Sequence, residues 1–124
     1  MQQEKRDNSY EFAKAQKCLA VACMELGQLL EAEAAATEGR NVLLRLSGKE
    51  HHQLPELYYI LGVTYKLQGN LPRVTETLRI SIDLMKLRPA EYVELLKKAH
   101  NSLCYVFLVQ QMYSEAEEVV WSII

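Results

Sequence analysis

The sequence lacks an excess of either charge, a glycine-rich loop and any long apolar run. Its 16 acidic and 14 basic residues leave a net charge of −2, so no basic surface for nucleic acid or an anionic membrane is expected. Its five glycines are scattered, which argues against a phosphate-binding loop. No apolar run reaches the roughly 18 residues needed to span a bilayer. We therefore expect no nucleic-acid partner and no membrane insertion.

Cysteine is also scarce. Cys18, Cys23 and Cys104 are odd in number and form no C-x-x-C pair, so neither a disulfide framework nor a zinc knuckle is predicted. The N-terminal segment MQQEKRDNSY is polar, where a signal peptide would need an apolar core. We expect a cytoplasmic protein in a reducing compartment, with residues 1–124 forming a single domain large enough to bury a core.

What the sequence does contain is an internal repeat, which decides the fold if it is real. Segments 17–33, 59–75 and 101–117 align at an offset of 42 residues. Matching positions hold leucines (Leu19, Leu61, Leu103), small residues (Ala20, Gly62, Cys104), thiol or ring side chains (Cys23, Tyr65, Phe107) and turns that begin at residues 27, 69 and 111. The predicted repeats span about 9–46, 53–87 and 89–124 and nearly fill the chain.

The period inside each unit is helical. Apolar residues recur every three or four positions, and strand alternation is absent. Two signals mark where helices begin. Capping-box spacing is present at Asn8 with Glu11 and at Ser114 with Glu117. Prolines suited to a first helical turn are Pro55, Pro72 and Pro89. We predict helices at about 9–26, 30–46, 53–68, 72–87, 89–110 and 114–124, paired into hairpins whose small residues allow close approach.

The middle unit resembles the tetratricopeptide repeat (TPR). That family's signature has Leu-Gly three residues before Tyr and a Gly at the turn, matched here by Leu61-Gly62, Tyr65 and Gly69. The 42-residue spacing and the linker LSGKEH at 46–51 are similar to the longer repeats of kinesin light chains. The resemblance implies an all-α fold: an α-solenoid of three helix-turn-helix hairpins in a right-handed superhelix, with a concave groove that binds a partner peptide or helix.

The resemblance also places the first helix of each hairpin at the groove. The residues expected there are Lys14, Lys17, Val21 and Met24, then Tyr59, Val63 and Lys66, then Lys98, Asn101, Tyr105 and Leu108. Tyrosines would anchor apolar groups, lysines would form a cationic rim, and Asn101 would bind peptide backbone. Such a groove suits an acidic and partly hydrophobic segment. A solvated face without a ligand, or a groove filled by the protein's own helix, is the alternative.

The C-terminal sequence VVWSII is apolar, whereas a solenoid usually closes with a helix that has a polar outer face. We expect either a fragment of a longer repeat array or self-association, including a homodimer, through Trp121, Ile123 and Ile124.

No catalytic, metal or cofactor site is predicted. The adjacent His51 and His52 do not have the i, i+4 spacing of a helical zinc site. His100 and Cys104 are spaced like a nucleophile pair, but Cys104 stands at the packing position of its hairpin, where a core thiol is expected. The leading hypothesis is a non-enzymatic interaction module or scaffold. The alternative is a self-associating structural segment that works through its C-terminal helix.

Overall fold

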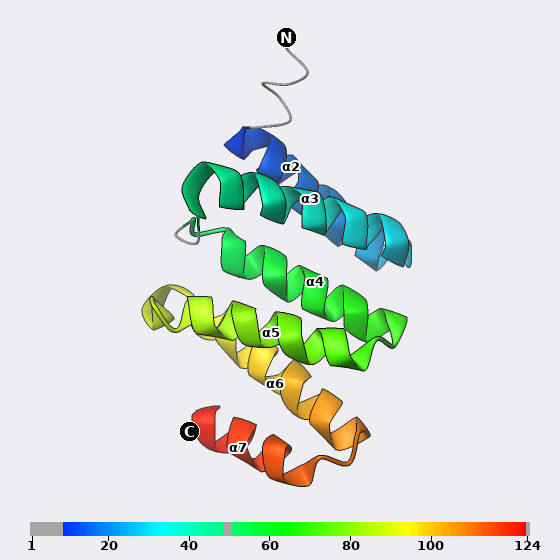
Figure 1. Ribbon diagram of the computed structural model, residues 1–124, viewed down its shortest axis with the longest axis vertical. Helices are drawn as coiled ribbons and strands as arrows, with labels where there is room; N and C mark the ends of the chain where they lie inside the picture. The colour runs from blue at the N-terminus through cyan, green and yellow to red at the C-terminus, as the bar shows by residue number, and fades with distance from the viewer. Residues whose placement is uncertain (1–8, 49–50, 124) are drawn as a thin grey trace.

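The computed structural model describes residues 9–48 and 51–123, and within these ranges it contains helices and no strand (Figure 1). The helices are α2 (Tyr10–Glu25), α3 (Leu29–Ser47), α4 (Leu54–Gln68), α5 (Leu71–Met85), the short 3-10 helix η2 (Pro89–Glu91), α6 (Val93–Val109) and α7 (Tyr113–Ile123). The predicted all-α fold is confirmed.

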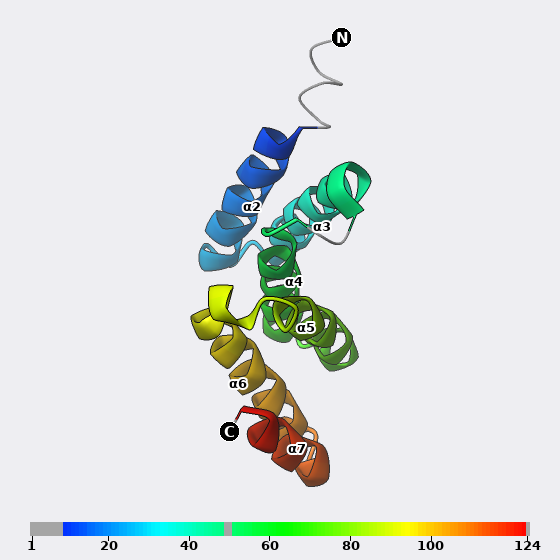
Figure 2. The same ribbon diagram turned by 90° about the vertical axis from the view of Figure 1, so that its left-hand side faces the viewer.

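The α-helices pair into hairpins that stack in chain order. Helix α2 packs on α3, α4 on α5 and α6 on α7, and contacts of α3 with α4 and of α5 with α6 join the hairpins. Figure 1 shows an elongated stack, and Figure 2 shows α4 set back to the right of α2 and α6. The chain is therefore an α-solenoid in which each hairpin buries a face on the next.

The hairpin turns share one geometry. Gly27, Gly69 and Gln111 stand at the same repeat position and have positive φ angles of 78°, 80° and 60°. The next residue in each turn donates its N–H to the carbonyl five residues back: Gln28 to Cys23 at 2.8 Å, Asn70 to Tyr65 at 3.0 Å and Met112 to Phe107 at 2.8 Å. This bond belongs to the Schellman type of helix end, and it recurs at the 42-residue offset seen in the sequence.

Close packing of α4 on α5 depends on the glycine at position 62. A Cβ atom there would lie 2.6 Å from Leu78 Cδ2 and 2.9 Å from Leu78 Cγ, well inside the normal separation of about 3.5–4.0 Å between carbon atoms. Ala20 is fully buried at the matching position of the first hairpin, and Cys104 is half-buried in the last. The small residues of the first helices therefore let the second helices approach.

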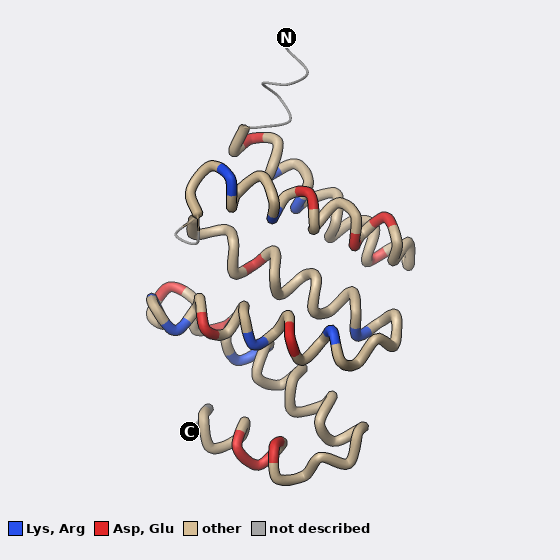
Figure 3. The backbone as a smooth tube through the Cα atoms, in the orientation of Figure 1, with Lys and Arg blue, Asp and Glu red and all other residues tan. Residues whose placement is uncertain are grey.

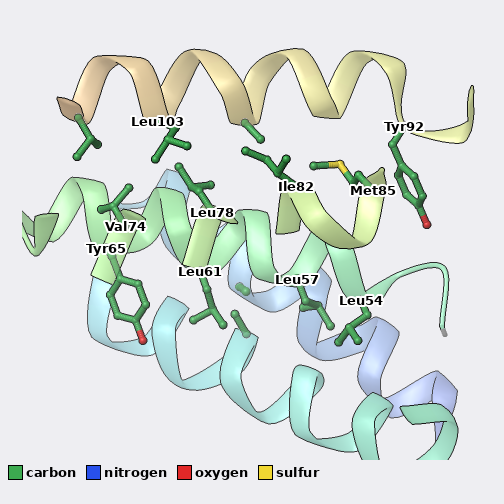
Figure 4. Packing of buried hydrophobic residues seen from close by; sticks show 14 of the residues in the cluster. Leu54, Leu57, Leu61, Tyr65, Val74, Leu78, Ile82, Met85, Tyr92 and Leu103 are labelled. Atoms are coloured by element: carbon green, nitrogen blue, oxygen red, sulfur yellow. The ribbon is translucent and has the colours of Figure 1, made fainter. Parts of the chain in front are cut away.

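The core lies along the stacking interfaces. In Figure 4, Leu57 and Leu61 of α4 point toward the first hairpin, whereas Leu78 and Ile82 of α5 face α6, from which Leu103 points toward them. All five side chains are buried. Burying one leucine contributes roughly 1.5–3 kcal/mol. Because such side chains lie on both faces of the middle hairpin, packing on both neighbouring hairpins stabilises it.

The start of α6 differs from the prediction. Pro89 opens the separate turn η2, and α6 begins at Val93 rather than at residue 89. Tyr92, between the two, has φ −124° and ψ 28°, which are not helical values. Its hydroxyl donates to the His52 carbonyl at 2.6 Å, and this bond to the linker before α4 holds Tyr92 in place.

The predicted capping boxes also need correction. The residue that caps α2 is Ser9, whose hydroxyl accepts the Phe12 N–H at 3.0 Å, while Asn8 lies outside the described residues. Helix α7 begins at Tyr113, and the Ala116 N–H donates to the Met112 carbonyl at 3.0 Å. Ser114 therefore lies inside the first turn and is not the residue at the cap.

Candidate functional site

The residues expected in the groove lie on α2, α4 and α6, and α4 contacts both other helices. Lys14, Val21, Lys98, Asn101, Tyr105 and Leu108 are exposed, while Lys17, Met24, Tyr59, Val63 and Lys66 are partly buried. The bonds that these side chains make within the protein decide which of them remain available to a partner.

Lys17 forms an ion pair between the first two hairpins. Its Nζ donates to Glu56 Oε2 at 2.7 Å and so joins α2 to α4. Ion pairs that solvent reaches contribute about 0–1 kcal/mol. The main consequence is therefore electrostatic, because the pairing neutralises Lys17 within the groove.

Lys66 joins α4 to α6. Its Nζ lies 5.3 Å from the centre of the Tyr105 ring and donates to Ser102 Oγ at 3.5 Å. A cation over an aromatic ring is stabilised by about 0.5–1 kcal/mol at an exposed site. Tyr105 nevertheless remains 55% exposed, so much of its ring is available for further contacts.

A cleft of about 590 Å³ opens between α4, η2 and α6. This volume lies within the range of pockets that hold small ligands, and it could also take one or two large side chains. Of the residues predicted for the groove, Tyr59 and Lys98 line it. The full lining is Glu56, Tyr59, Ile60, Ala90, Glu91, Tyr92, Val93, Glu94, Leu95 and Lys98.

Two phenols of the cleft have raised pKa values. Burial raises the pKa of Tyr59, and the Ser102 hydroxyl partly offsets this effect. Burial also raises the pKa of Tyr92, the carboxylates of Glu91 and Glu56 raise it further, and Arg88 acts in the opposite direction. Both phenols therefore stay protonated at neutral pH.

The cleft is not cationic, contrary to the rim predicted from the sequence. Its lining carries the carboxylates of Glu56, Glu91 and Glu94 against the single ammonium group of Lys98. Lys17 is paired with Glu56, and Lys66 lies over Tyr105. The prediction of a cationic rim rested on the lysines of the groove helices and did not include Glu91 and Glu94, which the fold brings beside Lys98.

Sequence reasoning missed the η2 segment because it extended α6 back to residue 89. Ala90, Glu91 and Tyr92 instead form one wall of the cleft. The predicted boundary at Arg88 is present, since Arg88 has φ −141° and ψ 63° and the residue before a proline avoids the helical region. The missed break lies after η2, at Tyr92, where no proline or glycine marks it in the sequence.

A second surface lies where α6 turns into α7. Residues 99–114 contain no Lys, Arg, Asp or Glu, and this stretch is entirely tan in Figure 3. Leu108, Val109 and Tyr113 are exposed within it. Trp121 of α7 is 66% exposed, and its indole N–H donates to Glu117 Oε1 at 3.3 Å. Ile123 ends α7, and Ile124 lies outside the described residues.

The histidines bond to backbone groups nearby in the chain. His51 Nδ1 accepts the Gln53 N–H at 3.0 Å, and its ring stacks on His52. His100 Nδ1 donates to the Leu96 carbonyl at 2.9 Å, while Cys104 Sγ lies 4.0 Å from the Ala116 carbonyl oxygen. Within the described ranges, no three His, Cys, Asp or Glu side chains are grouped to hold a metal ion.

Comparison with known proteins supports the fold. No family model and no curated protein matches the sequence. The crystal structure of BtubC (BKLC) from P. vanneervenii, a kinesin light chain-like protein, is similar with a TM-score of 0.83 and 20% identity, over 94% of this chain and 47% of that chain. The fold is a TPR-like helical repeat. This chain spans about half the length of BtubC, and identity at this level establishes the fold alone.

Among the described residues, none of the helices is long and apolar enough to cross a membrane.

Proposed function

We propose that the protein is a non-enzymatic interaction module that holds a segment of a protein partner along α2, α4 and α6. The observation that carries this proposal is the cleft of about 590 Å³ between α4, η2 and α6. Exposed Tyr105 and Leu108 lie on the same helix as one wall of the cleft. Aromatic side chains that become buried in an interface supply much of its binding energy. The TPR-like fold supports the same conclusion.

Different side chains of the groove would contact different parts of the partner. Tyr59 and Val63 are half-buried and would contact apolar groups of the partner, and the exposed amide of Asn101 would bond to its backbone. Lys14, Val21 and Met24 would extend the contact along α2. Because TPR-like hairpins stack end to end, the same groove would also serve as one section of a scaffold.

An affinity pull-down from cell lysate, read by mass spectrometry, tests this proposal. The baits are the intact protein, a Tyr105→Ala/Leu108→Glu variant and a Leu30→Glu variant. Leu30 is an exposed leucine on α3, outside the three groove helices, so it is a matched control. We expect a partner that the intact and Leu30→Glu baits retain and the groove variant loses.

Circular dichroism checks that all three baits are equally helical. Retention of the same proteins by every bait would contradict the groove proposal.

We place the module in the cytoplasm, since Cys18, Cys23 and Cys104 are all free thiols, as expected in a reducing compartment.

The exposed Trp121 favours a second candidate function, self-association through α7. Val120 and Tyr113 are also exposed on the same helix, and exposed apolar side chains that gather on one element often mark an interface. Analytical ultracentrifugation tests this candidate: a dimer that becomes monomeric on Trp121→Glu would support it, and a monomer at all concentrations would contradict it.

A further inference from the structure

The cleft between α4, η2 and α6 combines apolar walls with negative charge. Ile60, Val93 and Leu95 supply apolar surface, and the ring of Tyr59 lies among them in the lining. Glu56, Glu91 and Glu94 supply carboxylates from three different elements, namely α4, η2 and α6. The cleft therefore offers two kinds of contact in one place.

The three carboxylates are not equally available. Glu56 is bonded to Lys17 at 2.7 Å. Glu94 makes an exposed contact of 3.8 Å with Lys97, one turn along the same helix, and such an exposed pair holds its partners only weakly. Glu91 is exposed, and no ion pair to it is found among the described residues. Glu91 and Glu94 are thus the carboxylates that a ligand's cation could reach.

We propose that this cleft takes a peptide segment that presents one arginine or lysine next to a large apolar residue. This inference rests on the proposed function and specifies the partner's chemistry. The cation pairs with Glu91 and Glu94, as charge-assisted bonds to carboxylates are the stronger kind. The apolar residue packs against Tyr59, Ile60 and Val93. An arginine would also stack on an aromatic ring, which lysine does less well.

Lys98 limits the number of cations in the segment. It is the one ammonium group in the cleft lining, on the helix turn that follows Glu94. A run of basic residues would bring a second cation beside Lys98, where like charges repel. The segment is therefore one with a single basic residue at the cleft, and a polybasic segment fits it poorly.

Selection from a phage-displayed library of random peptides on the immobilised full chain tests the inference. The most enriched peptide is then synthesised with a fluorophore, and its dissociation constant is measured by anisotropy. We expect enriched sequences with one Arg or Lys beside an aromatic or aliphatic residue. Affinity should fall as salt rises, because the exposed charges are screened.

A Glu91→Lys/Glu94→Lys variant locates the binding site. We expect it to bind the peptide on the order of tenfold more weakly, since reversing two solvent-reached pairs removes about 1–2 kcal/mol. Glu25→Lys/Glu76→Lys is the control, because it makes the same charge change at exposed positions outside the cleft, and it should change affinity less than twofold. Circular dichroism verifies that both variants keep their helical content.

Three outcomes would overturn the inference: enriched peptides that carry Asp or Glu in place of the base, equal weakening by both variants, or no enrichment. In each case a groove-dependent partner in the pull-down would leave the general proposal standing. If the Tyr105→Ala/Leu108→Glu bait retained the same proteins as the intact bait, the proposed function itself would be overturned.

Discussion

The first and middle hairpins place the same leucine in opposite surroundings. Leu19 of α2 and Leu61 of α4 are 42 residues apart at one repeat position, yet Leu19 is 51% exposed and Leu61 is fully buried. Leu61 points toward the hairpin before it (Figure 4), whereas within the described residues no helix precedes α2. A repeat position therefore specifies which face a residue occupies, and the neighbouring hairpin decides whether that face is buried.

The last hairpin differs from the middle one in the same way. Helix α5 packs on both α4 and α6, and Leu78 is fully buried between them. Helix α7 buries Ala116 and Val119 but exposes Val120 and Trp121. The exposed apolar surface of this solenoid is thus concentrated where stacking is one-sided, and the mutations below test that difference.

The largest expected effect is the contrast between the two leucines. We expect Leu61→Ala to lower the free energy of unfolding by about 3 kcal/mol, because it removes a buried side chain and leaves a cavity. Leu19→Ala should change it by less than about 0.5 kcal/mol, as surface substitutions usually do. Urea unfolding followed by circular dichroism measures both. Equal losses would show that Leu19 is covered in solution.

The packing position of the hairpins gives a second contrast. Gly62→Val should cost about 2 kcal/mol, because its side chain would overlap Leu78 and force the helices apart. Cys104→Val, at the matching position of the last hairpin, should cost less than about 1 kcal/mol, since it changes the side-chain volume little at a half-buried site. Unfolding curves with a similar loss for both variants would argue against a special role for Gly62.

Much of this architecture is predictable from the sequence because the repeated positions are determined by contacts between residues close together in the chain. The small residue at 62, the turn at 69 and the helical period each depend on contacts within one hairpin. The cleft does not, because its walls come from α4, η2 and α6 and depend on how hairpins stack. The negative charge of the cleft was not predicted for two reasons: Glu91 comes from η2, which the sequence did not indicate, and Glu56 meets Lys17 only across two hairpins.

The turns offer a smaller contrast between repeats. Gln111 adopts a φ of 60° where the other hairpins have glycine, and a left-handed conformation costs a residue with a Cβ roughly 1 kcal/mol. We expect Gln111→Gly to stabilise the chain by up to about 1 kcal/mol, and Gly69→Gln to destabilise it by a similar amount. Thermal unfolding of both variants measures the changes. A destabilising Gln111→Gly would mean that the glutamine side chain makes contacts of its own.

The smallest expected effect is on the pH dependence of folding stability, and it compares the buried His100 with His51 of the linker. Burial lowers the pKa of His100, Lys86 lowers it further and the Leu96 carbonyl partly opposes this. Above the ordinary value of about 6.5 the imidazole is neutral whether the chain is folded or unfolded. Below it the unfolded chain binds the proton more readily, so stability falls as pH drops from 6.5 toward the lower folded pKa.

Replacing His100 with glutamine should therefore flatten the stability profile between pH 7.5 and 5, as measured by urea midpoints. Burial and the neighbouring His52 also lower the pKa of His51, with the same sign of effect. His51 is present in both proteins and cancels in their difference. A profile that His100→Gln leaves unchanged, but His51→Gln flattens, would assign the pH dependence to the linker between the first two hairpins and not to the core of the last.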